Sequence, residues 1–370
     1  MIEVFHIISH FDLGGAEKVA FDIASSPNPA IRYHLIEVQR GSSGYTPKFI
    51  ADMQNMNIHY HRSWIPDIHY HYIFERIAMV FFPLWFIFIY LKYRPSVIHV
   101  HTELPDQAIY YFLKLFPWTQ KHFRLVRTIH NTVLWTGRKR KGMRIEKQLF
   151  QPQHANVAIS DLVRDQYQLE FGATAPIIYN GISAVSQLPF DTIRKGKINI
   201  LFAGRMEPQK GISTLTDIIG SLKDDERYFF HVIGKGPLQH QLQQALEGCR
   251  NVAVYPVVYH LSSYLASFDY LLMPSVHEGL SILAMEAGIQ RLANIINDCA
   301  GLKDILPDDW PLKVHDNDLR QYQQLFREVL PAADKKALGN QAYQYVNQHY
   351  SLQRMQQQYE HVYLQTINIK

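Results

Sequence analysis

The sequence predicts an α/β protein of two domains, each built on a parallel sheet with helices packed against it. Short apolar runs alternate with longer helical segments along all 370 residues, which is typical of parallel strands joined by crossover helices. The alternation starts again near Ile198, after a loop-like stretch at residues 182–197. We therefore expect domains at residues 1–181 and 198–350, a linker at 182–197 and a helical segment at 351–370.

Ten apolar runs with strand character underlie this prediction, five in each half of the chain. They lie at residues 3–9, 33–38, 96–101, 124–130, 156–160, 198–204, 228–234, 251–256, 270–275 and 292–298. Helical patterns lie between them, for example at residues 16–24, 238–248 and 261–268. In open α/β sheets, ligands bind at the carboxyl ends of the strands, so the functional motifs should follow these runs.

The composition limits the class of protein. Hydrophobic residues make up 47% of the chain and charged residues 19%, which suffices for a sizeable core. Two cysteines exclude a disulfide framework and a cysteine-rich zinc site, and they fit a reducing compartment. The first residues lack the basic leader of a secretory signal, so we expect a cytoplasmic location.

Several glycine and cationic residues that follow predicted strands suit a nucleoside diphosphate. Gly14 and Gly15 follow the first strand, where glycine lets the backbone approach a phosphate at a helix start. Arg205 and Lys210 place two cations on a strand-to-helix turn, as a pyrophosphate requires. The turn IGKGPL at residues 233–238 does not match a dinucleotide fingerprint, so turn geometry alone also explains its glycines.

Two glutamates stand eight residues apart in the largely apolar stretch SVHEGLSILAMEAG, residues 275–288. If a helix begins at Leu280, Glu278 lies at its entrance and Glu286 about 12 Å further along. We interpret the pair as two contacts to one extended ligand, at its sugar end and at its ribose end.

Taken in order, these motifs resemble the retaining glycosyltransferases of family 4, whose GT-B fold places two Rossmann-like domains on either side of a central cleft. A GT-B chain is also expected to return its C-terminal helix to the N-terminal domain. The resemblance covers nearly the whole chain and rests on the segments GGAEKVA, SVIHVHTE, TIHN, VAISDLV, IYNGIS, FAGRMEPQKGISTL, IGKGPL and MPSVHEGLSILAMEAG.

The resemblance implies roles for individual residues. Glu286 would bind the ribose hydroxyls of the donor, and Glu278 would lie near the donor sugar or, as a lesser alternative, act as a covalent nucleophile. Arg205 and Lys210 would neutralise the diphosphate, Gly15 would contact it, and His130 would lie near the acceptor. The backbone amides of Gly279, Leu280 and Ser281 would face the negative charge at a helix start. The chain departs from the family pattern around the sugar pocket, at Leu280, Ser281, Arg291, Ala293 and Pro256.

No metal or other cofactor is expected. An Asp-x-Asp motif, which holds a divalent cation in other glycosyltransferases, occurs only at residues 316–318, far beyond the expected site. His99 and His101 stand two apart on one predicted strand, but neither a third histidine nor a carboxylate accompanies them in the sequence. We therefore place His101 on the acceptor side rather than in a metal site.

Two stretches of the first half suggest contact with an anionic membrane. Residues 1–180 carry 19 Lys and Arg against 14 Asp and Glu. Residues 77–91 form an apolar run that is too short to span a bilayer and contains Pro83, so they either touch lipid or pack inside the domain. The second stretch combines an aromatic side chain with four cations, which fits an anionic leaflet, an anionic acceptor or a solvated loop: Trp135, Arg138, Lys139, Arg140 and Lys141.

The sequence thus predicts a retaining, metal-independent glycosyltransferase. It would move a hexose or N-acetylhexosamine from a nucleotide diphosphate sugar, most simply a UDP-linked one, to a lipid-linked or growing glycan in polysaccharide biosynthesis. Two alternatives remain: a catalytically silent GT-B module that binds a sugar nucleotide or glycan, and a GT-B sugar-nucleotide epimerase. The basic residues are too few to favour nucleic acid as a partner.

Overall fold

The computed structural model divides the chain into two compact units, and it describes residues 1–12, 14–66 and 71–365, without the side chains of residues 71–76. Unit 1 comprises Met1–Gly181 and Leu352–Lys370, and unit 2 comprises Ile182–Ser351. Residues 182–197, where the sequence predicts a linker, therefore belong to unit 2. There the Leu188 amide donates to the Ser263 carbonyl at 2.6 Å.

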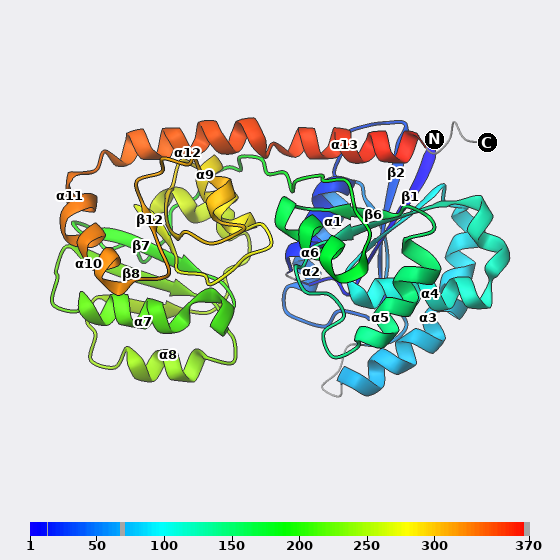
Figure 1. The fold of residues 1–370 in the computed structure, drawn as a ribbon, viewed down its shortest axis with the longest axis horizontal. Coiled ribbons are helices and arrows are strands. Elements are labelled where there is room, and N and C mark those ends of the chain that lie inside the picture. Colours follow the sequence, from blue (N-terminus) through cyan, green and yellow to red (C-terminus); the bar gives the residue numbers. More distant parts are fainter. Residues whose placement is uncertain (13, 67–70, 366–370) are drawn as a thin grey trace. The chain divides into compact units, whose positions relative to one another are not determined.

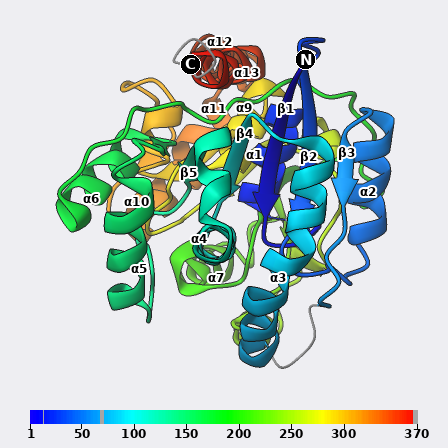
Figure 2. The ribbon, with the colours of Figure 1, turned by 90° about the vertical axis from the view of Figure 1, so that its right-hand side faces the viewer.

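Unit 1 is built on a six-stranded parallel sheet with the order β3-β2-β1-β4-β5-β6 (Figures 1 and 2). This is the strand order of a Rossmann fold, in which the chain reverses its direction of progress between the first and fourth strands. The strands are β1 (Ile2–Ile8), β2 (Ile31–Glu37), β3 (His59–His61), β4 (Val97–His101), β5 (Arg124–Ile129) and β6 (Asn156–Ala158).

The helices of unit 1 connect these strands, and the last one comes from the end of the chain. They are α1 (Gly15–Ala24), α2 (Thr46–Asn55), α3 (His71–Tyr93), α4 (Glu103–Leu115), η1 (Pro117–His122), α5 (Lys139–Ile145), η2 (Glu146–Phe150), α6 (Asp161–Phe171) and α13 (Leu352–Leu364). Helix α13 packs against α1 (Figure 1), where Gln356 Nε2 donates to the Asp22 carbonyl at 2.7 Å. Pro83, which the apolar run at residues 77–91 contains, lies inside a continuous α3.

Unit 2 repeats the same architecture, with the order β12-β11-β10-β7-β8-β9 and all pairs parallel. Its chain reverses its direction of progress between β7 and β10, so these two neighbouring strands form the switch point of the sheet. The strands are β7 (Ile198–Ala203), β8 (Tyr228–Ile233), β9 (Val252–Tyr255), β10 (Tyr270–Met273), β11 (Ala293–Asn297) and β12 (Lys313–Val314).

The helices of unit 2 follow its strands, and several are single turns. They are η3 (Pro208–Lys210), α7 (Ile212–Ser221), α8 (Gln239–Ala245), η4 (Leu261–Ser267), α9 (Ile282–Ile289), η5 (Lys303–Ile305), α10 (Leu319–Gln324), η6 (Leu325–Val329), α11 (Leu330–Ala332) and α12 (Lys335–His349). Helix α9 packs against α12, and α7 packs against α10.

All ten predicted strands are present, and the prediction of two Rossmann-like domains is confirmed. The sequence analysis missed β3 and β12, which are edge strands of three and two residues. Such strands carry too few side chains to display a period of two, and the His-Tyr-His of β3 is not apolar. Their pairing depends on the neighbouring strand rather than on their own pattern.

Candidate functional site

The carboxyl edge of the unit 2 sheet holds a compact cluster of Lys210, Glu278 and Ser275. Lys210 follows β7, and Ser275 and Glu278 follow β10, so the cluster lies at the switch point. Lys210 Nζ lies 2.6 Å from Glu278 Oε1, and Ser275 Oγ donates to the same oxygen at 2.8 Å. Glu278 is buried, and a carboxylate is retained there because a cation and a hydroxyl satisfy it. Two of the predicted donor residues are thus brought into contact.

Backbone packing fixes the two loops that carry this cluster. Gly211 has φ +68° and lies so close to the Pro274 carbonyl that any Cβ would collide with it. Gly301, at φ +79°, packs in the same way against the Glu278 carbonyl. The Val276 amide also donates to the Gln209 carbonyl at 2.8 Å. Only glycine tolerates both the left-handed backbone and the close approach, so these positions hold Lys210 and Glu278 in register.

Polar residues that the sequence analysis did not single out support the same edge. Asn297, at the end of β11, donates through Nδ2 to the Ser275 carbonyl at 3.0 Å, and Asn317 donates to the Pro274 carbonyl at 3.0 Å. Cys299 Sγ donates to the Ser275 carbonyl at 3.3 Å, and burial together with the negative charge of Glu278 raises the pKa of its thiol to about 12. Their sequence signal is weak: Asn297 stands at the end of the predicted strand at 292–298, Cys299 directly follows that strand, and Asn317 lies in a later loop.

Arg205 lies on the turn after β7, with a largely exposed side chain. Its guanidinium is 3.3 Å from Glu207 Oε1, and such an exposed pair is weak. A weakly held cation on the surface of this turn remains available to a ligand. The neighbouring IGKGPL turn packs Gly234 against the Gly204 carbonyl and Gly236 against the Met206 backbone, so loop packing requires its glycines.

Helix α9 begins later than Leu280, at Ile282, with Ser281 as its N-cap. Ser281 Oγ accepts from the Ala284 amide, and the Ser281 amide donates to the Gly301 carbonyl at 3.2 Å. The predicted role of the Ser281 amide in binding phosphate is therefore wrong for this structure, because that N–H is already bonded. Leu280 is buried, Gly279 is half-buried, and Glu286 is half-buried on the second turn of α9.

In unit 1, Gly14 is the N-cap residue of α1 and Gly15 is its first residue. Gly14 has an extended backbone, and a Cβ there would collide with the carboxylate of Glu17. Glu17 is buried in the first turn of α1, where the helix dipole favours negative charge. This clash involves only the flexible end of the Glu17 side chain, so it does not by itself require glycine at position 14.

Histidines gather at the carboxyl edge of the unit 1 sheet and on the face next to it. His130 follows β5 and is half-buried, whereas His101 at the end of β4 is fully buried. Their ring nitrogens, His101 Nδ1 and His130 Nε2, are 3.2 Å apart. A third histidine, which does not accompany His99 and His101 in the sequence, joins them in space, because β1 pairs with β4 and places His6 opposite His99. A neighbour that is 93 residues away in the chain leaves no local signal.

Trp135 is fully buried, so the expectation that it presents an aromatic ring to a membrane is wrong. Its Nε1 donates to Glu146 Oε1 at 3.3 Å, and its ring fills the space that Gly142 leaves free. Glu146 and Asp106 also pair with the buried Arg127. Burial raises the pKa of Asp106 to about 7, although the charge of Arg127 opposes the shift. Trp135 thus closes a buried ionic network beneath the loop that carries the basic residues.

The four cations of this loop begin helix α5 and differ in exposure. Lys139 and Arg140 are exposed, and Lys139 Nζ lies 3.3 Å from Glu170 at the surface. Lys141 is half-buried, donates to Gln107 and lies over the Tyr111 ring. Arg138 is the N-cap residue of α5 and is also half-buried. Two of the four predicted cations are therefore exposed at the surface, and one of them is already paired with Glu170.

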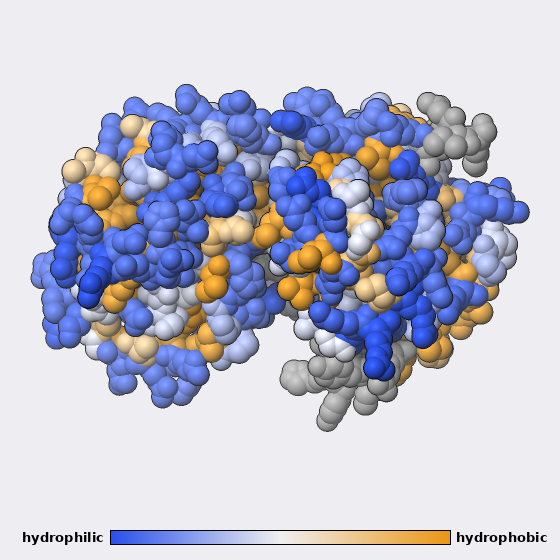
Figure 3. Space-filling view, in the orientation of Figure 1, coloured by the Kyte–Doolittle hydropathy of each residue, from blue (hydrophilic) through white to orange (hydrophobic). Residues whose placement is uncertain are grey.

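Residues 77–91, expected either to touch lipid or to pack inside the domain, lie in helix α3, which has one buried and one exposed face. One face, which includes Phe82, Trp85 and Phe86, is buried against the domain. The other face is apolar and exposed: Val80 (63%), Phe81 (46%), Leu84 (44%), Phe88 (67%) and Leu91 (50%). Hydrophobic residues accordingly reach the surface over α3 in Figure 3. Among the helices of the described residues, none combines the length and the apolar character that a membrane crossing requires.

Comparisons with known proteins agree with this architecture. Residues 13–185 match the family model described as Glycosyltransferase Family 4, and residues 197–330 match the model described as Glycosyl transferases group 1. An uncharacterized 41.2 kDa protein in the cps region of Klebsiella pneumoniae is 28% identical over 242 residues. The match covers 59% of this chain and 64% of that protein. The putative teichuronic acid biosynthesis glycosyltransferase TuaC of Bacillus subtilis is 29% identical over 106 residues, 28% of this chain and 26% of TuaC.

Three solved structures share the fold at low identity. A glycosyltransferase from Rickettsia africae gives a TM-score of 0.77 with 13% identity, covering 100% of this chain and 99% of its own. Anabaena HepE in complex with UDP and glucose gives a TM-score of 0.74 with 14% identity, covering 98% of this chain and 99% of the HepE chain. A TarM mutant of S. aureus, in complex with Fondaparinux, alpha-GlcNAc-glycerol and UDP, gives a TM-score of 0.72 with 12% identity. The match covers 98% of this chain and 100% of the TarM chain. With both family models and the fold in agreement, the chain belongs to the GT-B glycosyltransferases of the family 4 type.

Proposed function

We propose that this protein is a retaining hexosyltransferase. It takes a hexose or N-acetylhexosamine from a UDP-linked donor, bound by unit 2, and transfers it to a hydroxyl of a lipid-linked or growing glycan, bound by unit 1. The observation that carries the proposal is the cluster of Lys210, Glu278 and Ser275 at the switch point of the unit 2 sheet. Ligands of open α/β sheets bind at this place.

Charge development explains why the cluster suits sugar transfer. Cleavage of the bond between the sugar and the diphosphate leaves negative charge on the diphosphate, and a fixed cation stabilises that charge more in the transition state than in the ground state. Lys210 is such a cation, since its contact with the buried Glu278 holds its ammonium group in place. Arg205, on the same turn and exposed, supplies a second one. These two cations take the place that a divalent metal fills in other glycosyltransferases.

The donor is proposed to be UDP-linked, with Glu286 binding the ribose hydroxyls and Glu278 lying near the sugar. HepE and TarM, which share the fold, were each crystallised with UDP, and this supports the choice of nucleotide. Glu286 is half-buried on α9, eight residues beyond Glu278. A carboxylate there accepts two hydroxyl hydrogen bonds at once, which a ribose provides.

Retention is proposed to follow a front-face route, in which the departing phosphate oxygen accepts the proton of the attacking hydroxyl. Glu278 is less suited to act as a covalent nucleophile, because Lys210 and Ser275 both bind its Oε1. These bonds lower the electron density that a nucleophilic oxygen needs. They instead suit a carboxylate that orients the cation.

The acceptor is proposed to be a lipid-linked or growing glycan, presented at the cytoplasmic face of a membrane. The cps region of the Klebsiella relative and the teichuronic acid named for TuaC support a role in surface polysaccharide synthesis. The exposed apolar face of α3 supports peripheral contact with lipid, and the exposed Lys139 and Arg140 support an anionic surface. Trp135 has no part in this contact because it is buried.

Product analysis tests the proposal. The purified protein is incubated with UDP-glucose, UDP-galactose, UDP-N-acetylglucosamine or UDP-N-acetylgalactosamine, with and without a lipid-linked glycan acceptor, in EDTA and in Mg²⁺. The proposal requires acceptor-dependent release of UDP, an α-linked product from an α-linked donor, and equal rates in both buffers. A new sugar nucleotide formed without acceptor would identify an epimerase. Binding without turnover in any combination would identify the silent module.

A further inference from the structure

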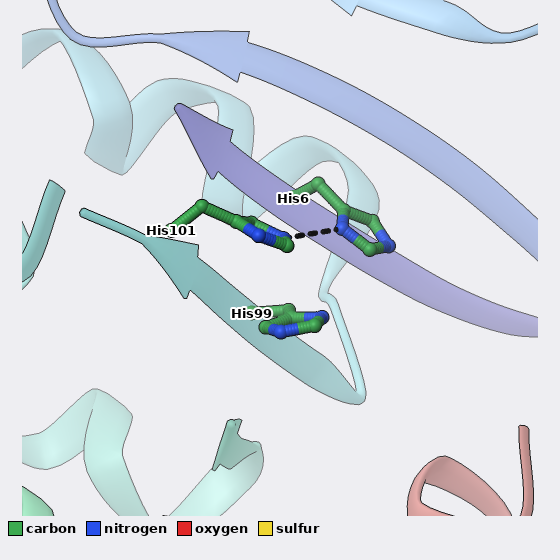
Figure 4. A group of neighbouring side chains, drawn as sticks. All are labelled: His6, His99 and His101. Atoms are coloured by element: carbon green, nitrogen blue, oxygen red, sulfur yellow. Dashed lines mark hydrogen bonds between the residues drawn. The ribbon is translucent and has the colours of Figure 1, made fainter. Parts of the chain in front are cut away.

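Three imidazoles form a hydrogen-bonded row from the interior of unit 1 to the carboxyl edge of its sheet. His6 Nδ1 and His101 Nε2 are 2.9 Å apart, the contact drawn in Figure 4, and His101 Nδ1 and His130 Nε2 are 3.2 Å apart. His6 and His101 are fully buried, whereas His130 is half-buried. The row therefore connects an interior ring, through one intermediary, to a ring that a ligand can reach.

All three rings are neutral near pH 7. Burial lowers the pKa of His6 to about 3 and that of His101 well below its usual range, and the neighbouring histidines lower the latter further. Burial, followed by the positive charge of Arg127, lowers the pKa of His130 to about 3. A neutral imidazole carries one N–H and one bare nitrogen. Two consecutive hydrogen bonds between three such rings can therefore run in only two directions.

The interior end of the row selects between these directions. If the N–H groups point outward, His6 donates from Nδ1 to His101, His101 donates from Nδ1 to His130, and His6 Nε2 is bare. If they point inward, His6 Nε2 carries a hydrogen. This nitrogen is buried and has no hydrogen-bond partner among the residues that the structure describes. Buried N–H groups without an acceptor are rare in proteins, so the outward direction costs less.

The adjacent His99 does not alter this choice. Its Nδ1 lies 2.7 Å from the Tyr363 hydroxyl and its Nε2 lies 2.7 Å from Thr128 Oγ1, so both of its nitrogens are engaged outside the row. One candidate ligand nitrogen each of His6, His99 and His101 lies within 4.8 Å of the other two, but both nitrogens of His99 and both of His101 are already engaged in hydrogen bonds. A tetrahedral zinc site with bonds of about 2.0–2.1 Å brings its nitrogens to roughly 3.4 Å from each other. The geometry favours a hydrogen-bond network over a metal centre.

We infer that His6 and His101 are positioning residues that hold His130 as a neutral ring with Nδ1 protonated and Nε2 accepting from His101. In this tautomer, His130 offers an N–H to the ligand at the edge of the unit 1 sheet. It donates a hydrogen bond to a hydroxyl or phosphate oxygen and does not remove a proton as a general base. The identity of that ligand as a sugar rests on the proposed function, whereas the tautomer belongs to the protein alone.

Side-chain ¹⁵N NMR of the ¹⁵N-histidine-labelled full chain tests the inference without any substrate. A His130→Asn variant identifies the His130 signals by their loss. The wild-type protein should show His130 protonated on Nδ1 and not titrating between about pH 5 and 8. A wild-type His130 protonated on Nε2 would overturn the inference, because the row would then run inward.

Two substitutions at His101 separate positioning from mere packing. His101→Leu removes the donor to His130 Nε2, so the tautomers of His130 should mix, whereas burial and the charge of Arg127 should still keep its pKa low. His101→Gln keeps an amide N–H that can donate, and it should preserve the wild-type tautomer and the absence of titration. Unchanged His130 signals in a folded His101→Leu protein would contradict the inference. If His101→Leu does not fold, the folded His101→Gln protein provides the test. A His130 tautomer in His101→Gln that differs from the wild-type tautomer would then contradict the inference.

The same variants keep this inference distinct from the proposed function. If the wild-type protein shows the expected tautomer yet transfers no sugar, the positioning stands and the proposed function fails. If it transfers sugar, His101→Leu should raise KM for the ligand that His130 contacts more than it lowers kcat, and His101→Gln should restore KM. If His130 instead acted as a general base, His101→Leu should lower kcat and add an acidic limb to the pH profile of the reaction.

Discussion

Glu278 is an acid buried at the edge of a sheet, and its contacts explain why the chain can bury it there. Lys210 and Ser275 satisfy one of its oxygens, and Gly211 and Gly301 lock the loops that bring them together. Removing one partner of a buried pair leaves the other unsatisfied, which usually costs more than the pair contributes. Stability and the proposed catalytic role therefore depend on the same two side chains, and a single substitution cannot separate them.

A double-mutant comparison can separate them. Lys210→Ala should lower the free energy of unfolding of unit 2 by about 1–3 kcal/mol, which is less than for a fully buried pair because the lysine is partly exposed. The same substitution should slow sugar transfer at least tenfold. Lys210→Ala combined with Glu278→Gln should recover much of the stability, since no buried charge remains. The rate should stay low, because Arg205 is then the only one of the two proposed cations left to face the diphosphate. Urea unfolding and an initial-rate assay give the two readouts. Recovery of the rate in the double variant would contradict the role of Lys210.

Arg291 shows how a departure from a family pattern can have a structural cause. It occupies a left-handed turn after α9, with φ +59°. Its guanidinium lies 4.0 Å from the centroid of the Tyr343 ring and its Nε donates to Asn340 at 3.0 Å. The Arg291 carbonyl also packs against Gly339. This residue joins α9 to α12, so its substitution should affect the stability of unit 2 before it affects the choice of sugar.

Helix α3 combines a buried face with an exposed face that is also apolar. A helix that faces only water normally has a polar outer face. Five large apolar side chains along one helix form a contiguous area of the kind that marks contact surfaces. The sequence could not assign the two faces, because nearly every position from 77 to 91 is apolar and no polar stripe shows which side meets the core. Packing against α4 supplies that information.

Replacing two residues of the exposed face tests whether α3 contacts lipid. The double substitution Phe81→Ser and Phe88→Ser should reduce binding to vesicles of anionic phospholipid at least tenfold, since each buried phenyl ring contributes about 1.5–3 kcal/mol. Co-flotation with the vesicles measures the bound fraction. Leu169→Ser is the matched control, because Leu169 is 80% exposed and lies on α6. Equal loss of binding in the control and in the α3 variant would contradict the assignment.

The cations at the start of α5 should contribute separately to membrane binding, and this contribution should weaken as the salt concentration rises. Lys139→Ser with Arg140→Ser removes two exposed cations and should weaken binding to anionic vesicles about tenfold, by roughly 1 kcal/mol or less for each charge. Binding to zwitterionic vesicles should not change, and activity on a soluble acceptor should be spared. Flotation at two salt concentrations provides the measurement. Persistent binding at low salt would exclude this loop from the contact.

For the whole molecule, the burial of neutral histidines makes stability depend on pH. Burial lowers the pKa of seven histidines in the described part of the chain: His6, His34, His61, His99, His101, His130 and His231. In the unfolded chain each titrates near 6.5. The unfolded state therefore binds more protons below that pH, and the stability that these residues provide is present above pH 6.5 and is lost as the pH falls toward their folded values.

Unfolding free energies at several pH values test this account. Each such histidine should contribute a loss of up to about 1.4 kcal/mol per pH unit below 6.5. Urea titrations between pH 7.5 and 5 should thus show a steep fall in the stability of unit 1, and His6→Phe should reduce the slope by about one proton. A flat profile over this range, or a slope unchanged by His6→Phe, would show that these rings are already protonated or exposed.

The two-domain fold could be predicted from the sequence because long parallel strands are apolar throughout and repeat at regular intervals. That Lys210 and Glu278 lie at the same edge of the unit 2 sheet could be predicted, because each lies in a loop that follows such a strand. Residues that meet only through the sheet order left no such signal, as with His6 and the supporting Asn297 and Asn317. Burial of Trp135 was also beyond prediction, since it depends on a glycine seven positions later and on an ionic network from three segments.

The central claim is that unit 2 binds the nucleotide of a UDP-sugar through Glu286 and the cluster around Lys210. Calorimetric titration of the full chain with UDP, GDP and ADP, repeated for Glu286→Ala, tests it most directly. The account predicts selective binding of UDP, weakened in the variant by about 1–3 kcal/mol, because two ribose hydroxyls lose their acceptor. Equal affinity for UDP in the wild-type protein and the variant, or selective binding of another nucleotide, would contradict it.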